Sequence, residues 1–282
     1  MKRDMEAGLY VVATPIGNLG DITARALEVL SQADIVAAED TRNTKSLLTH
    51  FGIGAKLVAV HAHNERKSAS DIARWIGEGK SVALVSDAGT PAVSDPGSAI
   101  VAAVREAGGR VIPVPGASAL TAALSASGIE FDGAVFAGFL PVKGTERRAR
   151  LAALASGPWA IVLFEAPHRI SQTLGDLHEA LGDRVVVIAR EITKRFETIA
   201  KVPLAGARAW VDADEDRRRG EFVLVIEGRA PVVRDPLDPA TVLAALLAEL
   251  PVKQAVALAV KITGGKRNAL YAIALELKGR SG

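Results

Sequence analysis

The sequence predicts an α/β protein with two domains and a helical appendage. Apolar runs of about 4 to 6 residues alternate with helical patterns of about 10 to 15 residues, which is typical of βαβ units in a mostly parallel sheet. Hydrophobic residues make up 49% of the chain and aromatic residues only 4%, as in parallel sheets covered by Ala-rich helices. Because 282 residues exceed the usual size of one domain, we expect two.

The first half of the chain alternates predicted strands and helices. The strands are expected at 9–14, 35–38, 56–60, 81–86 and 110–114, and the helices at 23–32, 42–50, 68–77, 97–107 and 118–127. A second series follows, with strands at 134–140, 160–164, 185–190 and 222–226 and helices at 146–155 and 169–181. We therefore predict α/β domains at residues 1–120 and 121–229.

Residues 230–282 are predicted to be a linker and a helical tail. The stretch 230–239 holds three prolines and has no hydrophobic periodicity, which indicates a linker. Asp238-Pro239 form an N-cap and N1 pair for a helix at 240–250, a second helix runs from Pro251 to 262, and Gly264-Gly265 end it before a third at 269–278.

The net positive charge of the chain lies in the tail. Residues 231–282 hold seven basic and four acidic residues, whereas the net charge of the whole chain is only +2. Three short helices with a glycine turn resemble a helix-turn-helix bundle whose cationic surface could contact phosphates. A solvated amphipathic bundle or a dimer arm explains the same pattern equally well.

Composition excludes several classes of site. The chain has no cysteine, which excludes disulfides, thiolate metal sites and thiol nucleophiles. Residues 1–8 are charged where a secretory signal would be apolar, and no apolar run approaches the roughly 18 residues of a membrane span. We expect a cytoplasmic protein without membrane contact and without a metal.

Two predicted strands run into turns rich in glycine and proline. The strand ending at Thr14 enters the turn 15–21, and the strand ending at Ser86 enters the loop 87–97. Ligands bind at the carboxyl ends of strands in open α/β sheets, where glycine lets bare backbone approach them. The first turn matches the dinucleotide fingerprint only in part, although Glu39 follows the second strand where a ribose-binding carboxylate is expected. An ordinary strand-to-helix connection is the alternative for this turn.

The second turn is the more specific of the two. Its backbone N–H and C=O groups could hold an amino-acid moiety and an adenine, with Asp87 or Asp95 pairing with an ammonium or a ribose hydroxyl. Either aspartate could instead form an Asx turn or an N-cap, and Asp95 before Pro96 suits the N-cap better.

Further candidate groups follow three other predicted strands. The turn 113–119 places Ser118 where it can cap the next helix or bind a ligand. The clusters FEAPHR at 164–169 and REITKRFE at 190–197 bring ionisable groups to the carboxyl edge of the second sheet, where chemistry or an anionic substrate would be met.

Several motifs in order resemble one family. They are ATPIGNLGD at 13–21, AEDTR at 38–42, SDAGTP at 86–91, SDPG at 94–97, FEAPHR at 164–169, REITK at 190–194 and ITGGKRNALY at 262–271. Together they are similar to the branch of the tetrapyrrole-methylase superfamily that methylates small-subunit ribosomal RNA. The wider superfamily has a glycine-rich first turn and a Gly-Asp-Pro second turn. Departures from both in this chain argue against a porphyrinoid substrate.

The resemblance implies two α/β domains with S-adenosylmethionine bound in the cleft between them, in a homodimer. It implies 2′-O-methylation of a cytidine ribose in the decoding centre of 16S rRNA, with the free rRNA or the 30S subunit as partner. The predicted cofactor-binding residues are Pro15, Gly17, Asp87, Ala88, Gly89, Thr90, Pro91, Ala117, Ser118, Phe164 and Ala166.

Two further groups of residues are expected to act on the RNA. A hydroxyl is a poor nucleophile near neutral pH, so a base that accepts its proton would help. The candidates for this base are Glu39, Asp40, Glu165, His168 and Glu191. The predicted phosphate-binding residues are Arg42, Arg169, Lys194, Arg195, Lys266 and Arg267.

Two other functions stay open at this point. One is a sibling enzyme that methylates a tetrapyrrole or a modified protein residue, and which would need no cationic tail. The other is a non-catalytic module that binds S-adenosylmethionine or RNA.

Overall fold

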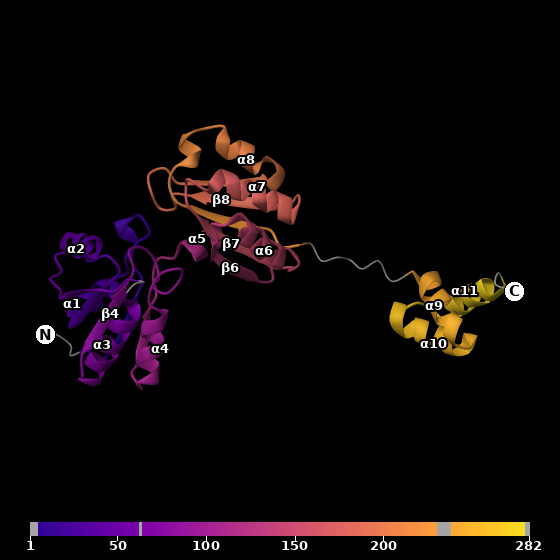
Figure 1. Ribbon diagram of the computed structural model, residues 1–282, viewed down its shortest axis with the longest axis horizontal. Coiled ribbons are helices and arrows are strands. Elements are labelled where there is room, and N and C mark those ends of the chain that lie inside the picture. Colours follow the sequence, from indigo (N-terminus) through magenta and orange to yellow (C-terminus); the bar gives the residue numbers. More distant parts are fainter. Residues whose placement is uncertain (1–4, 62–63, 230–237, 280–282) are drawn as a thin grey trace. The chain divides into compact units, whose positions relative to one another are not determined.

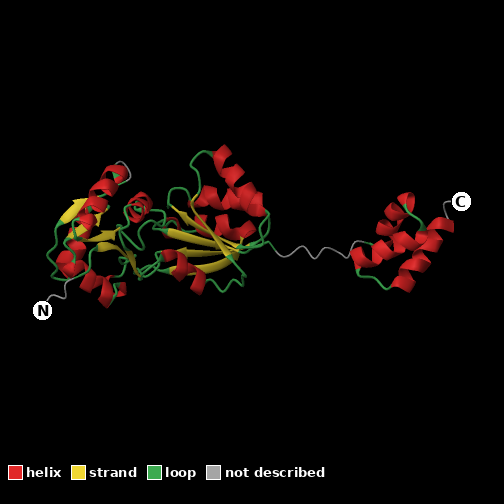
Figure 2. Ribbon diagram, turned by 90° about the horizontal axis from the view of Figure 1, so that it is seen from below, coloured by secondary structure: helices red, strands yellow, loops and turns green. Residues whose placement is uncertain are grey.

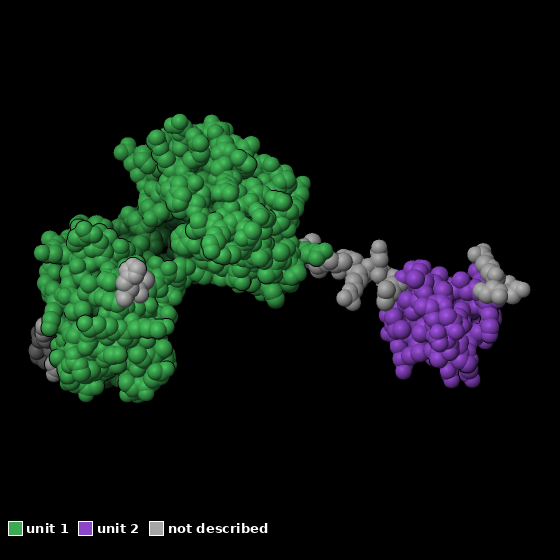
Figure 3. All heavy atoms as spheres, in the orientation of Figure 1, with its two compact units in different colours: residues 1–229 green, residues 230–282 purple. Residues whose placement is uncertain are grey.

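The computed structural model describes residues 5–61, 64–229 and 238–279. The chain divides into two compact units, 1–229 and 230–282, shown in green and purple in Figure 3. The first unit has two lobes, each built on its own sheet (Figure 1). Most of the predicted linker, with Arg234, lies outside the described residues.

The sheet of the first lobe is entirely parallel, with the strand order β3-β2-β4-β1-β5. Its strands are β1 (Gly8–Val12), β2 (Ile35–Ala38), β3 (Leu57–Ala59), β4 (Ser81–Val85) and β5 (Val111–Val114). Every residue of β2 and β4 is buried, as expected for central parallel strands covered on both faces. The carboxyl ends of all five strands meet at one edge, which is where the predicted turns emerge.

Helices cover both faces of this sheet (Figure 2). They are α1 (Ala24–Gln32), α2 (Thr41–His50), α3 (Glu65–Gly77) and α4 (Ser98–Glu106), with a 3₁₀ turn, η1, at Leu19–Asp21. Three of the expected helices fall close to these bounds, whereas α3 begins three residues before the predicted position 68. Its first turn is charged rather than apolar, so the apolar periodicity that predicted the helix starts only at Ala69.

The sheet of the second lobe is mixed, and here the prediction of mostly parallel strands was wrong. The order is β6-β7-β10-β8-β9, from β6 (Ala134–Phe139), β7 (Ala160–Glu165), β8 (Val185–Arg190), β9 (Thr198–Pro203) and β10 (Phe222–Ile226). Only β6 and β7 are parallel; β10 runs antiparallel to both β7 and β8, and β9 antiparallel to β8. Buried central strands look alike in either orientation, so apolar runs alone do not reveal direction.

Three elements of the second lobe were not predicted: β9, the helix α8 (Leu204–Asp212) and a 3₁₀ turn, η2, at Asp216–Arg218. β9 is an edge strand whose positions alternate between half-buried and exposed and which includes Lys201 and Pro203. It passes into α8 without a loop, because Pro203 is also the N-cap residue of that helix. Neither a turn signal nor an apolar run therefore separates β9 from α8 in the sequence.

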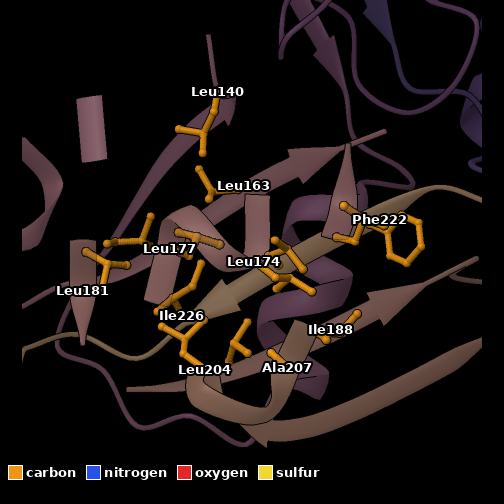
Figure 4. Close-up of a cluster of buried hydrophobic side chains, with 14 of the residues drawn as sticks. Leu140, Leu163, Leu174, Leu177, Leu181, Ile188, Leu204, Ala207, Phe222 and Ile226 are labelled. Carbon is orange, nitrogen blue, oxygen red and sulfur yellow. The ribbon is translucent and has the colours of Figure 1, made fainter. Parts of the chain in front are cut away.

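One face of the second sheet carries the main core of this lobe. Helices α6 (Gly144–Ala155) and α7 (Ile170–Leu181) contribute with α8 to a cluster that includes Leu163, Leu174, Ile188 and Phe222 (Figure 4). On the other face, α5 (Ala119–Ala126) packs Ala123 against β7, β8 and β10. The helix that follows the last strand of the first lobe thus belongs to the core of the second. A domain boundary near residue 120 stays a prediction.

Residues 238–279 form three helices around a small core of their own. These are α9 (Pro239–Glu249), α10 (Val252–Thr263) and α11 (Arg267–Gly279). The predicted start is confirmed, because the Asp238 carboxylate accepts hydrogen bonds from the first turn of α9 and Pro239 is its first residue. Gly264, with φ of 68°, ends α10 as predicted. Among the described residues, no helix is both long and apolar enough to cross a membrane.

Candidate active site

The three predicted turns of the first lobe are joined by hydrogen bonds. Thr14 N donates to Gly89 O at 2.9 Å, and Gly89 N donates to Thr14 O at 3.0 Å. The Thr14 hydroxyl donates to Ser86 O at 3.2 Å, and the Thr90 hydroxyl donates to Ala117 O at 3.3 Å. The turns therefore form one surface of backbone and small side chains.

A cavity of about 410 Å³ lies over this surface, between the two lobes. Its volume falls within the roughly 300–1,000 Å³ of small-molecule sites. The first lobe lines it with Ile16 and the loop 88–95, and the second lobe with the carboxyl ends of β6 and β7 and the start of β10. The lining residues are Ile16, Ala88, Gly89, Thr90, Val93, Ser94, Asp95, Ser118, Ala119, Phe139, Phe164, Glu165, Ala166, Pro167, Ile192, Glu221, Phe222 and Val223.

The predicted cofactor residues divide between this cavity and a neighbouring one. Ala88, Gly89, Thr90, Ser118, Phe164 and Ala166 line the first cavity. Pro15, Gly17 and Asp87, with Ala88 again, line a second and more polar hollow of about 460 Å³ above α2. Pro91 and Ala117 line neither; Pro91 is buried in the loop, and Ala117 holds Thr90 in place.

Gly89 is the position where the chain requires glycine most clearly. Its φ is 79°, in the left-handed region that a residue with a β-carbon adopts only with strain. An added β-carbon would also lie 3.3 Å from Cγ2 of Ile16. The glycine therefore keeps the loop close to the first turn and leaves the cavity wall without a side chain.

Ser118 and Asp87 use their side chains differently. Ser118 occupies the N-cap position of α5, but its side chain makes no capping hydrogen bond and lines the cavity. Asp87 accepts hydrogen bonds from Asp40 N and from the Asn43 amide, both at 3.0 Å. It thereby ties the second turn to the start of α2, whose N-cap is Asp40.

Two predicted bases lie together where β2 meets α2. Asp40 is the N-cap of α2 and pairs with Arg42 at 2.7 Å. Its hydrogen bonds from the side chain and then the backbone of Arg42 lower the pKa of Asp40 to about 2, which leaves it a weak base. The Glu39 carboxylate accepts a hydrogen bond of 3.4 Å from Asp87 N, and Glu39 belongs to the lining of neither hollow.

Glu165 lines the cavity, but its carboxylate is already bound by neighbouring groups of the protein. Its side chain has no exposed surface, and it accepts hydrogen bonds from Ala166 N at 2.8 Å and the Thr173 hydroxyl at 2.6 Å. Arg169 pairs with it at 3.3 Å and donates to Leu140 O at 2.7 Å. This arrangement fastens α7 to the ends of β6 and β7. His168, in the same motif, is exposed and lines neither hollow.

Glu191 and Lys194 form a cluster with Glu221 at the end of β8. Glu191 accepts hydrogen bonds from Glu221 N at 2.9 Å and from Lys194 Nζ at 3.0 Å. Burial opposes ionisation of this carboxyl group, but these hydrogen bonds and the charges of Lys194 and Arg190 outweigh burial and lower the pKa of Glu191. Lys194 also pairs with Glu221 at 2.8 Å, so its charge is compensated twice within the chain.

The remaining predicted RNA-binding residues are exposed. The Arg42 side chain is 89% exposed, and Arg195 lies on the surface with its guanidinium over the Phe196 ring, 5.5 Å from the centroid. Lys266 and Arg267 are exposed at the start of α11 in the helical unit. The structure thus separates these exposed cations from Arg169, which is bound to the buried carboxylate of Glu165.

Asp95 is a cavity residue that the sequence did not single out as a base. The alternative role as an N-cap was wrong for Asp95, because Gly97, which has no side chain to cap the helix, occupies that position in α4. Instead, Gly97 N and Ala99 N donate to Glu65 Oε1 at 2.8 and 3.0 Å. Burial and then the charge of Glu39 raise the pKa of Asp95 to about 6, against a hydrogen bond with Ser86.

The backbone around Asp95 is strained. Ala92 and Ser94 have φ values of 64° and 69° although neither is glycine, a conformation that costs on the order of 1–3 kcal/mol for each residue. Such strain persists where the surrounding structure holds the loop in one shape, and it concentrates at functional sites. The small side chains of the loop predicted a turn, but nothing in the sequence predicted this backbone strain.

Other cavity residues lie at strand ends where the sequence analysis predicted no site residue. Phe139 at the end of β6 is 53% exposed and lies edge-on to Phe164, with 5.8 Å between ring centroids. Gly138 before it has φ of 62°, and an added β-carbon there would lie 3.0 Å from Ser94 Oγ. The only feature of the sequence that could have indicated this part of the cavity was an aromatic residue after a glycine at a strand end.

Metal binding has no support in the described part of the chain. No group of three histidine, cysteine, aspartate or glutamate side chains among residues 5–61, 64–229 and 238–279 is arranged to hold a metal ion.

The comparison with protein families matches residues 8–207 to the model of the tetrapyrrole (corrin/porphyrin) methylases. The chain belongs to this family. Residues 234–278 match a second family model, the RsmI C-terminal HTH domain. The predicted fold, two α/β lobes with a helix-turn-helix-like appendage, is confirmed by these matches and by the two sheets.

Relatives similar over nearly their whole length carry one name, ribosomal RNA small subunit methyltransferase I. The protein of Escherichia coli O157:H7 is 51% identical over 273 residues, which is 96% of this chain and 96% of the relative. That of Pseudomonas aeruginosa is 48% identical over 282 residues, 98% of this chain and all of the relative. The predicted relationship to this branch of the family is therefore confirmed.

Solved structures of lower identity share the fold of the first unit. The methyltransferase CobJ aligns with a TM-score of 0.59 at 21% identity, over 79% of this chain and 95% of CobJ. Diphthine synthase aligns with a TM-score of 0.59 at 18% identity, over 79% of this chain and 90% of its own.

The cavity fits the methyl donor that the family implies. S-adenosylmethionine joins an amino-acid moiety to an adenosine, and this wall offers bare backbone at Gly89 beside the Thr90 hydroxyl, the Ser118 side chain and the Phe164 ring. A wall of this kind can bind backbone-like polar groups and a flat base at once. The residues present are therefore suited to the cofactor.

Proposed function

We propose that this protein transfers the methyl group of S-adenosylmethionine to the ribose 2′-hydroxyl of a cytidine in the decoding centre of 16S rRNA. The observation that carries the proposal is the cavity between the lobes, walled by three hydrogen-bonded turns, in a chain about half identical to proteins named ribosomal RNA small subunit methyltransferase I over their whole length. Substrate, homodimer and cytoplasmic location are parts of the same proposal.

The cofactor is assigned to the first cavity, the one between the two lobes. Gly89 and Ala88 bring backbone to its wall, Thr90 and Ser118 bring hydroxyl groups, and Phe164 and Ile16 bring apolar surface. When bound there, S-adenosylmethionine supplies a methyl group already activated by a sulfonium. The protein then has two tasks: to hold the ribose hydroxyl in line with that methyl group, and to exclude water.

The RNA is assigned to the open side of the same cavity and to the helical unit. Arg42 stands at the start of α2 with almost all of its side chain exposed, and its surface ion pair with Asp40 contributes little stability and can be exchanged for a phosphate. Phe139, half exposed at the cavity, offers a ring on which a base can stack. In the helical unit, Lys266 and Arg267 offer further phosphate contacts.

The test is transfer of labelled methyl groups to defined RNA. Purified protein is incubated with methyl-labelled S-adenosylmethionine and either 30S subunits or free 16S rRNA from cells that lack this modification, and ribose methylation is then mapped. We expect label on the 2′-oxygen of one decoding-centre cytidine. A parallel incubation with a tetrapyrrole separates the sibling activity, and binding of the donor without transfer to any of these substrates would contradict an enzymatic role.

Two simple measurements test the oligomeric state and the alternative of a non-catalytic binding module. Light scattering of the purified chain gives its molar mass, and a value of a single chain at micromolar concentration would contradict the homodimer. Because a non-catalytic module would bind donor and RNA with no turnover, single-turnover incubation with excess enzyme distinguishes it from a slow methyltransferase.

A further inference from the structure

We propose that Asp95 is the catalytic base that accepts the proton of the ribose 2′-hydroxyl, an inference that rests on the function proposed above. Asp95 lines the cavity between the lobes, in a loop that begins at the Gly89 turn and ends at α4. It therefore lies on the same wall as the residues assigned to the methyl donor. None of the five bases predicted from the sequence combines a position in this cavity with a carboxylate that has no cationic partner.

The other carboxylates near the cavity already have partners. Asp40 is held by Arg42 and by the first turn of α2. Glu165 is buried against Arg169 and Thr173, and Glu191 is held by Lys194 and the Glu221 backbone. A carboxylate that already receives two or three hydrogen bonds or a cation has little basicity left for a substrate proton.

Asp95, in contrast, has no cationic partner among the described residues, whose ion pairs do not include it. The groups that act on it are the carboxylates of Glu39 and Asp87 at the ends of β2 and β4, and the Ser86 hydroxyl. Glu165 and Glu221 face the same cavity from the second lobe. Like charges and burial favour the protonated form of Asp95. The ionised carboxylate therefore has a raised affinity for a proton, as a general base requires.

The loop geometry fixes the position of this carboxylate. Ala92 and Ser94 hold left-handed φ values on its amino-terminal side, and the Glu65 carboxylate binds two backbone N–H groups just beyond it, at Gly97 and Ala99. Ser94 Oγ also lies 3.0 Å from the position that a β-carbon on Gly138 of β6 would take, so a side chain there would press against the loop. A base placed by a strained and anchored loop keeps its geometry during reaction.

The step balances without any further reactant. The ribose 2′-oxygen forms its bond to the methyl carbon with a lone pair as the carbon–sulfur bond breaks, and that bond's electron pair stays on sulfur. The hydroxyl proton moves to a carboxylate oxygen of Asp95. Asp95 then releases the proton to solvent, which it does readily near neutral pH because its pKa is about 6.

The first test is Asp95→Asn, which keeps the size of the side chain and removes its basicity. We expect single-turnover methylation of unmodified 30S subunits to fall by roughly 100- to 10,000-fold, the usual contribution of a general base. Affinity for S-adenosylhomocysteine, measured by calorimetry, should stay within about threefold, because the cofactor wall is unchanged. The matched control is Asp71→Asn, an exposed aspartate paired with Arg74 on α3, which should leave both quantities unchanged.

The second test follows protonation directly, without turnover. Carbon-13 spectra of the aspartate carboxyls should contain a resonance that titrates near pH 6 and disappears in Asp95→Asn. In the wild type the methylation rate should rise roughly tenfold per pH unit below this value and level off above it. Glu39→Gln should move both midpoints to lower pH, since the Glu39 charge raises the pKa of Asp95.

The outcomes separate the two proposals. A wild-type protein that methylates no RNA overturns the proposed function, whatever Asp95→Asn does. A wild-type protein that methylates 30S subunits while Asp95→Asn retains its rate within about threefold overturns the base. Loss of S-adenosylhomocysteine binding in Asp95→Asn would make Asp95 a cofactor ligand and also overturns it. If Asp95→Asn does not fold, Asp95→Glu takes its place and should keep a slower rate with the same form of pH dependence.

Discussion

The backbone of Gly17, in the first turn, lies directly against the side chain of Lys194 in the second lobe. A β-carbon added to Gly17 would fall 2.5 Å from Cγ of Lys194. Lys194 cannot easily yield, because Glu191 and Glu221 hold its ammonium group. The two lobes are therefore in contact at this point, where the first lobe presents a glycine and the second lobe a lysine side chain held in place by two carboxylates.

This contact predicts the effect of Gly17→Ala. The new methyl group must displace Lys194 or the turn, and at φ of 153° alanine is also strained. We expect the affinity for S-adenosylmethionine to fall by at least about tenfold, a loss of about 1.4 kcal/mol. Calorimetry measures it, with Gly54→Ala as control, since Gly54 has no neighbour within 4 Å of an added β-carbon. Equal affinities in the two variants would contradict the importance of the contact.

Gly89→Ala tests the cavity wall itself. Gly108 offers a close match, with φ of 76° against 79° for Gly89 but with open space around it. Both alanine variants should lose about 1 kcal/mol of unfolding free energy from left-handed strain. Only Gly89→Ala should weaken cofactor binding, because only there does the methyl group reach Ile16 and the cavity. Thermal unfolding and calorimetry on the same samples separate the two effects.

Arg169→Ala distinguishes a structural arginine from a phosphate-binding one. Arg169 was predicted to contact RNA, but its guanidinium pairs with the fully buried Glu165 carboxylate and binds Leu140 O. Removing it leaves a buried charge without its cation, which costs about 3–5 kcal/mol. We expect a large fall in melting temperature. Arg42→Ala, in contrast, should weaken RNA binding without a change in stability, and the reverse pattern would restore the original assignment.

Sequence patterns predicted the first lobe far better than the second, for a physical reason. Parallel strands joined by helices give long alternating periods with clear turns, and each expected strand from Leu9 to Val114 appears in the structure. In the second lobe, β9 alternates polar and apolar residues at a sheet edge and leads straight into α8, so nothing marks where either begins. Strand direction depends on loop paths and was not visible at all.

The sequence predicted the position of the site more successfully than the roles of its residues. Glycine and proline at strand ends reveal turns, and the three turns do meet at Thr14, Gly89 and Ala117. The role of a carboxylate depends on its partners, which are distant in sequence. Glu165 binds Thr173 and Arg169, whereas the groups that shift the pKa of Asp95 are two carboxylates and a hydroxyl, and no local pattern distinguishes the two.

Deletion of residues 230–282 tests the contribution of the helical unit. This unit has its own core, formed by residues such as Leu243, Val256 and Leu270. The deletion should therefore leave the affinity for S-adenosylmethionine unchanged and should raise the concentration of 30S subunits needed for half-maximal methylation. A double substitution, Lys266→Ala with Arg267→Ala, should act in the same direction with less effect and should weaken the salt dependence of binding. Unchanged methylation in both variants would remove the unit from RNA recognition.

Asp95→Asn also predicts a change in stability that needs no substrate. The pKa of Asp95 is raised from 3.8 to about 6 in the folded protein, so the folded state binds the proton more tightly than the unfolded state does. The ionised carboxylate therefore destabilises the fold increasingly as the pH rises from about 4 to 6, and the full penalty remains above this range. Asparagine carries no charge, so the variant should melt at a higher temperature than the wild type at pH 8, and the difference should shrink towards zero near pH 4. A difference independent of pH would mean that Asp95 keeps an ordinary acidity in the cavity.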